Sequence, residues 1–118
     1  MFASPAYADW VAVSKNEFGT TYYVDIERIR TNGSNVYFWQ LTDLLKPDKD
    51  GDLSYKDYVQ GDCEMFRTKY LSISSYKQPM GEGVPYTTDS LPNSEWKYPP
   101  PNSSGEGILK RVCRRAGL

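Results

Sequence analysis

The stretch Asn35-Val36-Tyr37-Phe38-Trp39-Gln40-Leu41-Thr42-Asp43-Leu44-Leu45 decides the predicted fold. Its residues are mostly β-branched, aromatic or large and aliphatic, as is typical of a strand. Apolar residues occur in both alternating sets, with Val36, Phe38 and Leu44 on one side and Tyr37, Trp39, Leu41 and Leu45 on the other. A strand that is apolar on both faces is usually covered on both, so we expect it at the centre of a sheet.

Three other segments are predicted to be strands: Trp10–Lys15, Thr21–Asp25 and the long run Asp62–Lys77. The apolar residues of the long run change parity along its length, which indicates a bulge near its middle. Residues 26–30 either continue the second strand or form one helical turn. Turns rich in Asn and Gly fall at residues 16–20 and 31–35.

The remaining segments are expected to be connections. Residues 46–61 are polar and are predicted to link two strands. Residues 78–101 contain six of the eight prolines, so we expect a loop with one short strand at residues 95–98. Trp10, Trp39 and Trp96 are expected in the core, and Arg67 is expected to pair with Asp25, Asp43 or Asp62.

A helix is predicted near the end of the chain. Ser103 and Glu106 have the spacing of a capping box, with the serine at the N-cap. Apolar residues then follow at helical spacing on one face: Ile108, Leu109, Val112, Cys113 and Ala116. The fold class is therefore α+β, with one antiparallel sheet and one packed C-terminal helix.

Composition narrows the function. The 118 residues carry a formal net charge of -1, which gives no overall basic attraction for nucleic acid. No apolar run approaches the roughly 20 residues that a membrane-spanning helix needs. The chain has no histidine, which removes the commonest general base and metal ligand. We therefore expect no catalytic residue, no cofactor and no metal.

The first residues indicate export. Residues 2–8 resemble the tail of a secretory signal peptide, with Ala6 and Ala8 at the small-residue positions and Asp9 as the first mature residue. A disordered alanine-rich tail is the alternative. The domain is thus expected to span residues 9–118, after a signal-peptide remnant at 1–8. Export favours a disulfide between the two cysteines, Cys63 and Cys113, over two reduced thiols.

Two acidic patterns are candidate sites. Asp48, Asp50 and Asp52 have the spacing that opens a calcium loop, but Leu53 replaces the glycine and Val59 the bidentate glutamate of that loop. A solvated acidic loop is therefore predicted, without a tight calcium site. Two pairs of carboxylates two residues apart, Asp25 with Glu27 and Asp62 with Glu64, are interpreted as surface acids instead of a glycosidase pair.

Candidate partner-binding residues come from the helix and the loop. The basic residues Lys110, Arg111, Arg114 and Arg115 could meet an acidic partner, although a solvated helix face that complements the helix dipole is the simpler reading. Tyr86 and Tyr98 are candidate partner-binding residues as well, because Tyr and Arg are enriched in binding hot spots. The ten tyrosines could otherwise fill the core of a small sheet.

In order along the chain, these features resemble the surface-adhesin protein E family of bacteria. The resemblance covers residues 10–114. Its marks are Trp10, Tyr23-Val24-Asp25, Asn35-Val36 leading to Trp39, Asp43, Asp62-Cys63 with Arg67, Tyr76, Met80-Gly81-Glu82-Gly83, Trp96 and Val112-Cys113. The resemblance implies a curved antiparallel sheet with a C-terminal helix tethered to it by a disulfide. It also implies an adhesin that binds host extracellular-matrix and serum proteins.

The leading hypothesis is a non-catalytic binding domain that is exported to the periplasm or the cell surface. Its partner would be a host matrix or serum protein, or another envelope protein. A periplasmic inhibitor or immunity-type protein that blocks one enzyme is the alternative. An enzyme is the third possibility, and no catalytic constellation in the sequence supports it.

Overall fold

The computed structural model describes residues 9–118, so the expected signal-peptide remnant lies outside the described residues. Seven strands form one antiparallel sheet, in the order β1-β2-β4-β5-β6-β7, and β3 also pairs with β4. Their bounds are β1 Trp10–Lys15, β2 Thr21–Asp25, β3 Arg30–Asn32, β4 Asn35–Asp43, β5 Ser54–Asp62, β6 Arg67–Tyr76 and β7 Thr87–Ser90. Two 3₁₀ turns, η1 Ile26–Arg28 and η2 Pro79–Gly81, and one helix, α1 Ser104–Arg115, are the other regular elements of residues 9–118.

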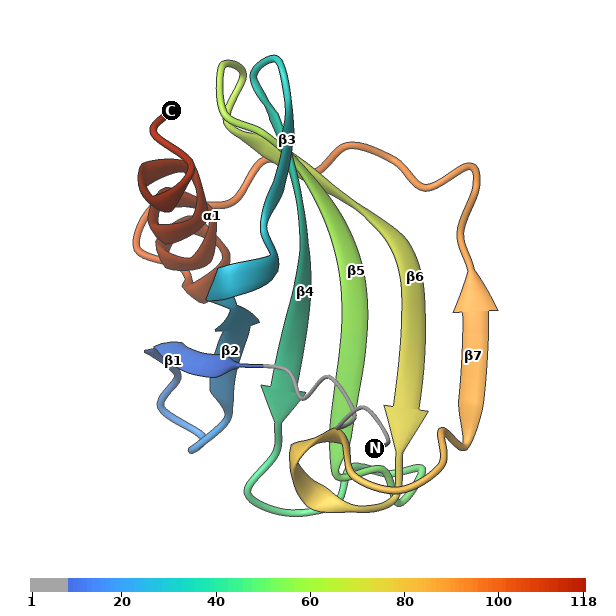
Figure 1. Cartoon of the computed structure of the whole chain (residues 1–118). Helices are drawn as coiled ribbons and strands as arrows, with labels where there is room; N and C mark the ends of the chain where they lie inside the picture. Colours follow the sequence, from blue (N-terminus) through green and yellow to red (C-terminus); the bar gives the residue numbers. More distant parts are fainter. Residues whose placement is uncertain (1–8) are drawn as a thin grey trace, which may run out of the picture.

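Strand β4 lies inside the sheet, as the opening sequence pattern predicted. One of its edges pairs with β5 along the whole strand, and the other pairs with β3 over its first residues and β2 over its last. In Figure 1, β4 to β7 lie side by side, while β1 and β2 bend away below α1. The single helical turn η1 carries the chain from β2 to β3 along this shared edge.

The two faces of the sheet are covered differently. Side chains alternate along a strand, so Val36, Phe38 and Gln40 of β4 lie on one face and Tyr37, Trp39 and Leu41 on the other. The first face, here called the helix face, packs against α1. Its core consists of Val24, Ile26, Val36, Phe38, Val59, Ile108, Leu109, Val112 and Cys113.

Within residues 9–118, the opposite face, here called the open face, is covered only at one end. There η2 lies over fully buried Leu41, and two hydrogen bonds hold it: Met80 N donates to Asp43 Oδ1 at 2.7 Å and Gly81 N to Ser54 Oγ at 2.8 Å. Trp39, which precedes Leu41 in β4, remains 38% exposed. The expectation that β4 is covered on both faces thus holds only near its last residues.

Several boundaries differ from the sequence prediction. Residues 54–61, predicted as part of a connection, form β5 together with Asp62, which was predicted to open the long strand. The long strand instead starts at Arg67, because residues 63–66 form the turn that joins β5 to β6. The expected bulge is present: Tyr58 pairs with Ser72 and Val59 with Tyr70, which leaves Leu71 as the extra residue. The short strand predicted at 95–98 is a single bridge between Thr68 and Lys97, and the regular strand of this region is β7.

The predicted core position of the three tryptophans was wrong. Trp10 and Trp96 are half-buried and Trp39 is exposed, and none belongs to the buried core. The buried core lies between α1 and the helix face, where Phe38 and aliphatic residues fill it, and the three tryptophans lie outside this cluster.

Candidate functional site

Helix α1 is capped at its start and joined to the sheet by a disulfide near its end. Ser103 caps its start, since the serine Oγ accepts a hydrogen bond from Glu106 N at 3.2 Å. Near its end, Cys113 forms the expected disulfide with Cys63 of the β5–β6 turn. A helix held in this way presents its outward side chains in a constant arrangement.

The four basic residues of α1 are all exposed, but they have different partners. Lys110 pairs with Glu106 one turn earlier at 3.4 Å, and Arg115 pairs with Glu27 of η1 at 3.0 Å. Within residues 9–118, Arg111 and Arg114 form no ion pair. These two guanidinium groups are therefore the members of the predicted set that are available to an acidic partner.

The two candidate tyrosines are exposed at 67% and 59%, but they do not form one surface with each other. Tyr86 precedes β7, where its N–H donates to Ser75 O and the Lys77 ammonium lies 4.0 Å from its ring centroid. Tyr98 lies near the start of β6, where its hydroxyl is 3.5 Å from Arg67 Nη1. Ser75 and Arg67 are at opposite ends of β6, so only Tyr98 lies at the disulfide end of the molecule.

Arg67 pairs with Asp62, one of the three partners proposed for it, at 3.0 Å. The guanidinium also stacks on Trp96, 4.2 Å from the ring centroid. The backbone N–H of Met65, together with the Arg67 side chain and the Glu64 N–H, holds the pKa of Asp62 below its usual value. The turn that carries Cys63 is thus closed by Asp62, which is a structural role for this carboxylate.

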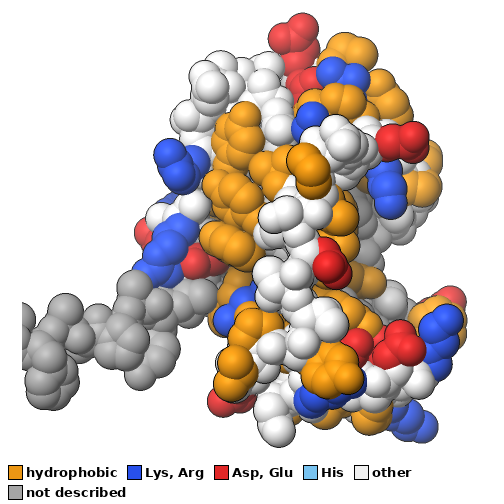
Figure 2. All heavy atoms as spheres, turned by 90° about the vertical axis from the view of Figure 1, so that its right-hand side faces the viewer, with side chains coloured by type: hydrophobic (Ala, Val, Ile, Leu, Met, Phe, Trp, Pro, Cys, Tyr) orange, Lys and Arg blue, Asp and Glu red, His pale blue; other side chains and the backbone are white. Residues whose placement is uncertain are grey.

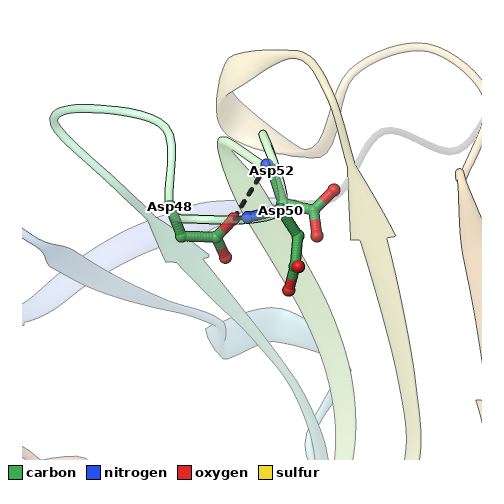
Figure 3. Close-up of side chains that lie close together, drawn as sticks. All are labelled: Asp48, Asp50 and Asp52. Atoms are coloured by element: carbon green, nitrogen blue, oxygen red, sulfur yellow. Dashed lines mark hydrogen bonds between the residues drawn. The ribbon is translucent and has the colours of Figure 1, made fainter.

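The loop between β4 and β5 brings Asp48, Asp50 and Asp52 together (Figure 3). Asp48 Oδ1 accepts hydrogen bonds from the N–H groups of Asp50 and Asp52, and its Oδ2 accepts one from the Tyr55 hydroxyl. This hydroxyl contributes most to lowering the pKa of Asp48. Asp52 pairs with Lys77 at 3.0 Å. Two of the three carboxylates are therefore engaged within the protein, and the absence of a tight calcium site stays a prediction.

The sequence pairs of carboxylates are separated by their partners. Asp25 is buried and pairs with Arg28 at 2.9 Å, whereas Glu27 is exposed and pairs with Arg115. Asp62 closes the β5–β6 turn, and Glu64 is exposed. In neither pair do the two carboxylates face each other across a cleft, as those of a glycosidase would.

One buried acid escaped the sequence analysis. Asp57 of β5 is 5% exposed, and its Oδ1 has no hydrogen-bond partner in the described structure. Burial raises the pKa of Asp57 to about 7. It was missed because residues 46–61 were predicted to be a polar connection, where an aspartate is unremarkable.

A groove on the open face also escaped the sequence analysis. It has a volume of about 350 Å³ and is lined by side chains from six elements, among them Trp10, Trp39, Lys56 and Tyr76. Figure 2, seen from the β7 side, shows hydrophobic side chains gathered in a column beside a polar strip. The alternation of Tyr37, Trp39 and Leu41 in the sequence was the available signal, but it was interpreted as core.

Comparison with known proteins accounts for this architecture. The family model described as surface-adhesin protein E matches residues 10–114. The chain belongs to the surface-adhesin protein E family. This family consists of exported adhesins, so the chain is an adhesin-like exported protein. A search of curated protein sequences found no match.

Solved structures of Haemophilus influenzae protein E resemble this adhesin E domain. Crystal form II has 16% identity and a TM-score of 0.70, with 98% of this chain and 95% of that chain covered. The structure from non-typeable Haemophilus influenzae has 15% identity and a TM-score of 0.64, with 98% and 82% covered. At these identities the similarity establishes a shared fold, and the binding residues of the adhesin E domain must be argued from its own surface.

Proposed function

We propose that this adhesin E domain is a non-catalytic binding protein at the bacterial cell surface, and that it contacts an acidic patch on a host matrix or serum protein. The observation that carries the proposal is the fixed helix α1, which presents Arg111 and Arg114 to solvent without an ion pair inside residues 9–118. Membership in an adhesin family supports protein contact as the activity.

The geometry of α1 suits recognition of an acidic surface. By the helical period, Arg114 lies opposite the buried stripe and Arg111 lies one turn before it. Guanidinium groups bind carboxylates with two parallel hydrogen bonds, which gives direction as well as attraction. Tyr98, at the disulfide end of the molecule, could add apolar contact area to the same interface, whereas Tyr86 is too far along β6 to share it.

Binding through these side chains is expected to be sensitive to salt. Exposed ion pairs contribute about 0.2–1 kcal/mol each and are screened at high ionic strength. Their main effect should therefore be on the association rate at low salt. Within residues 9–118, no helix has the length and apolar character needed to cross a bilayer.

The test begins with capture of partners from serum, from extracellular-matrix preparations and from bacterial envelope extract in parallel. Association with the captured partner is then compared for the parent domain and the double variant Arg111→Ser/Arg114→Ser. We expect the variant to associate several-fold more slowly at low salt, with a smaller difference at high salt.

A matched control removes two positive charges elsewhere. Lys46 and Lys49 are exposed in the β4–β5 loop, so Lys46→Ser/Lys49→Ser changes the net charge equally. Equal slowing by both double variants would show general charge steering and would remove α1 from the interface. Capture of a single bacterial enzyme with no host protein would replace the adhesin proposal by the inhibitor alternative.

A further inference from the structure

The floor of the open-face groove is built by three neighbouring strands. Lys56 of β5 pairs with Leu41 of β4 on one side and with Ser74 of β6 on the other. On the same face, Trp39 lies in the row before Leu41 of β4, and Tyr76 lies in the row after Ser74 of β6. Lys56 is therefore flanked diagonally by two aromatic rings on the same face of the sheet.

The wall of the groove comes from β1 and β2, at one edge of the sheet. Trp10 opens β1 and pairs with Asp25, which closes β2. The Asp25 carboxylate is nearly fully buried, and Arg28 pairs with it at 2.9 Å. A half-buried indole thus stands beside a charged pair whose oxygen and nitrogen atoms can accept and donate hydrogen bonds at the margin of the groove.

This combination suits a sugar ring. The volume of about 350 Å³ is at the small end of ligand pockets, which span roughly 300–1,000 Å³. Two indole rings and a phenol ring offer negative faces to the polarised C–H groups of a pyranose. Asp25, Arg28 and Ser74 supply acceptors and donors for its hydroxyl groups.

The charge of the groove selects the kind of sugar. The Lys56 ammonium lies 5.0 Å from the Tyr76 ring centroid, and within residues 9–118 it has no carboxylate partner. Because Arg28 balances the Asp25 carboxylate, the ammonium group of Lys56 gives the groove a net positive charge. A carboxylate on the ligand would balance this charge.

We propose that the open-face groove binds a carboxylated pyranose, such as a hexuronic acid, with its ring against Trp39 and Trp10 and its carboxylate on Lys56. This site is distinct from the outward face of α1. Its test uses the isolated domain and small sugars, so its outcome is independent of the protein partner proposed above.

The direct test follows the indole N–H signals of the three tryptophans by NMR during titration. The probes are methyl β-glucuronide, the uncharged methyl β-glucoside and acetate. We expect the glucuronide to shift the Trp10 and Trp39 signals and to leave Trp96 unmoved, since Trp96 stacks on Arg67 and Lys69, outside the groove. The glucoside should bind about tenfold more weakly, and acetate should cause no comparable shift.

Two lysine variants separate the carboxylate contact from general charge. Lys56→Met keeps the aliphatic stem that packs beside Gly81 and should weaken glucuronide binding about tenfold without changing glucoside binding. Lys69→Met removes a similar cation from above Trp96 and should change neither. Circular dichroism establishes that each variant is folded.

Other results would overturn the proposal. Unmoved Trp10 and Trp39 signals would exclude the groove, and an equal response to acetate would show a carboxylate site with no preference for a sugar. Retention of the preference for glucuronide in Lys56→Met would remove Lys56 from the site. A hyaluronan tetrasaccharide, which carries the same acid inside a chain, distinguishes polymer binding from binding of a free or terminal sugar.

Discussion

Asp57 is a buried residue whose ionisation is coupled to the fold. It lies on the helix face of β5, between Gln40 of β4 and Ile73 of β6, and no ion pair within residues 9–118 involves it. Burial raises its pKa to about 7. Burial also raises the pKa of the neighbouring Tyr70, with a smaller contribution from the charge of Asp57.

The sign of the resulting pH dependence follows from the protons bound in each state. Between about pH 4 and pH 7 the folded protein holds the Asp57 proton, which the unfolded chain releases. We therefore expect the free energy of unfolding to be largest near pH 4 and to fall by on the order of 3–4 kcal/mol by pH 8. Asp57→Asn should remove most of this fall in urea unfolding, while exposed Asp89→Asn should preserve it. Equal slopes for the parent and Asp57→Asn would refute the assignment.

At the scale of elements, Leu109 of α1 packs over Gly61 of β5, where a side chain would have no room. A Cβ at this position would lie 2.7 Å from Leu109 Cδ1 and 2.9 Å from Val36 Cγ2. Both distances are shorter than real Cβ contacts, so the absence of a side chain at Gly61 sets how closely α1 can pack on β4 and β5.

Gly61→Ala should therefore lower the free energy of unfolding by about 1–3 kcal/mol, because it overpacks the helix–sheet interface. The same change at Gly107 of α1 meets no atom within 4 Å and should instead raise stability by about 0.5–1 kcal/mol, through helix propensity alone. Chemical denaturation measures both. Combining Gly61→Ala with Leu109→Ala should cost less than the sum of the two single changes, and strict additivity would show that the predicted clash is absent.

At the scale of the molecule, the Cys63–Cys113 disulfide joins the only helix of residues 9–118 to the β5–β6 turn. Its cysteines are 50 positions apart, and Cys113 belongs to the buried core. The disulfide therefore closes a loop that contains β6, β7 and the proline-rich connection. It restrains the segment with the least regular structure.

In the chain-entropy model, a loop of this length stabilises the folded state by about 4 kcal/mol. Reduction with dithiothreitol should lower the urea midpoint accordingly. The double variant Cys63→Ala/Cys113→Ala should show a similar loss and no response to the reductant. An unchanged midpoint for the reduced parent would mean that packing of α1 alone holds the segment.

Features encoded within a few neighbouring residues were predicted from the sequence. Residues 10–15 and 21–25 have the bounds of β1 and β2, and the Ser103 cap and the buried stripe of α1 match the structure. The central place of β4 and the Cys63–Cys113 bond were also predicted. Each depends on a local pattern: alternation, a capping spacing, helical periodicity, or two cysteines in an exported chain.

Strand β5, the groove and the exposure of Trp39 were decided only by the tertiary structure. Ser-Tyr-Lys-Asp-Tyr-Val-Gln-Gly-Asp contains one aliphatic residue, and it becomes a strand because β4 and β6 offer backbone partners on both edges. The groove forms where Trp10 lies beside residues of β4, β5 and β6. Trp39 is exposed because, within residues 9–118, one helix covers only one of the two faces of the sheet. Pairing and coverage depend on residues far apart in the sequence, so no local pattern contains them.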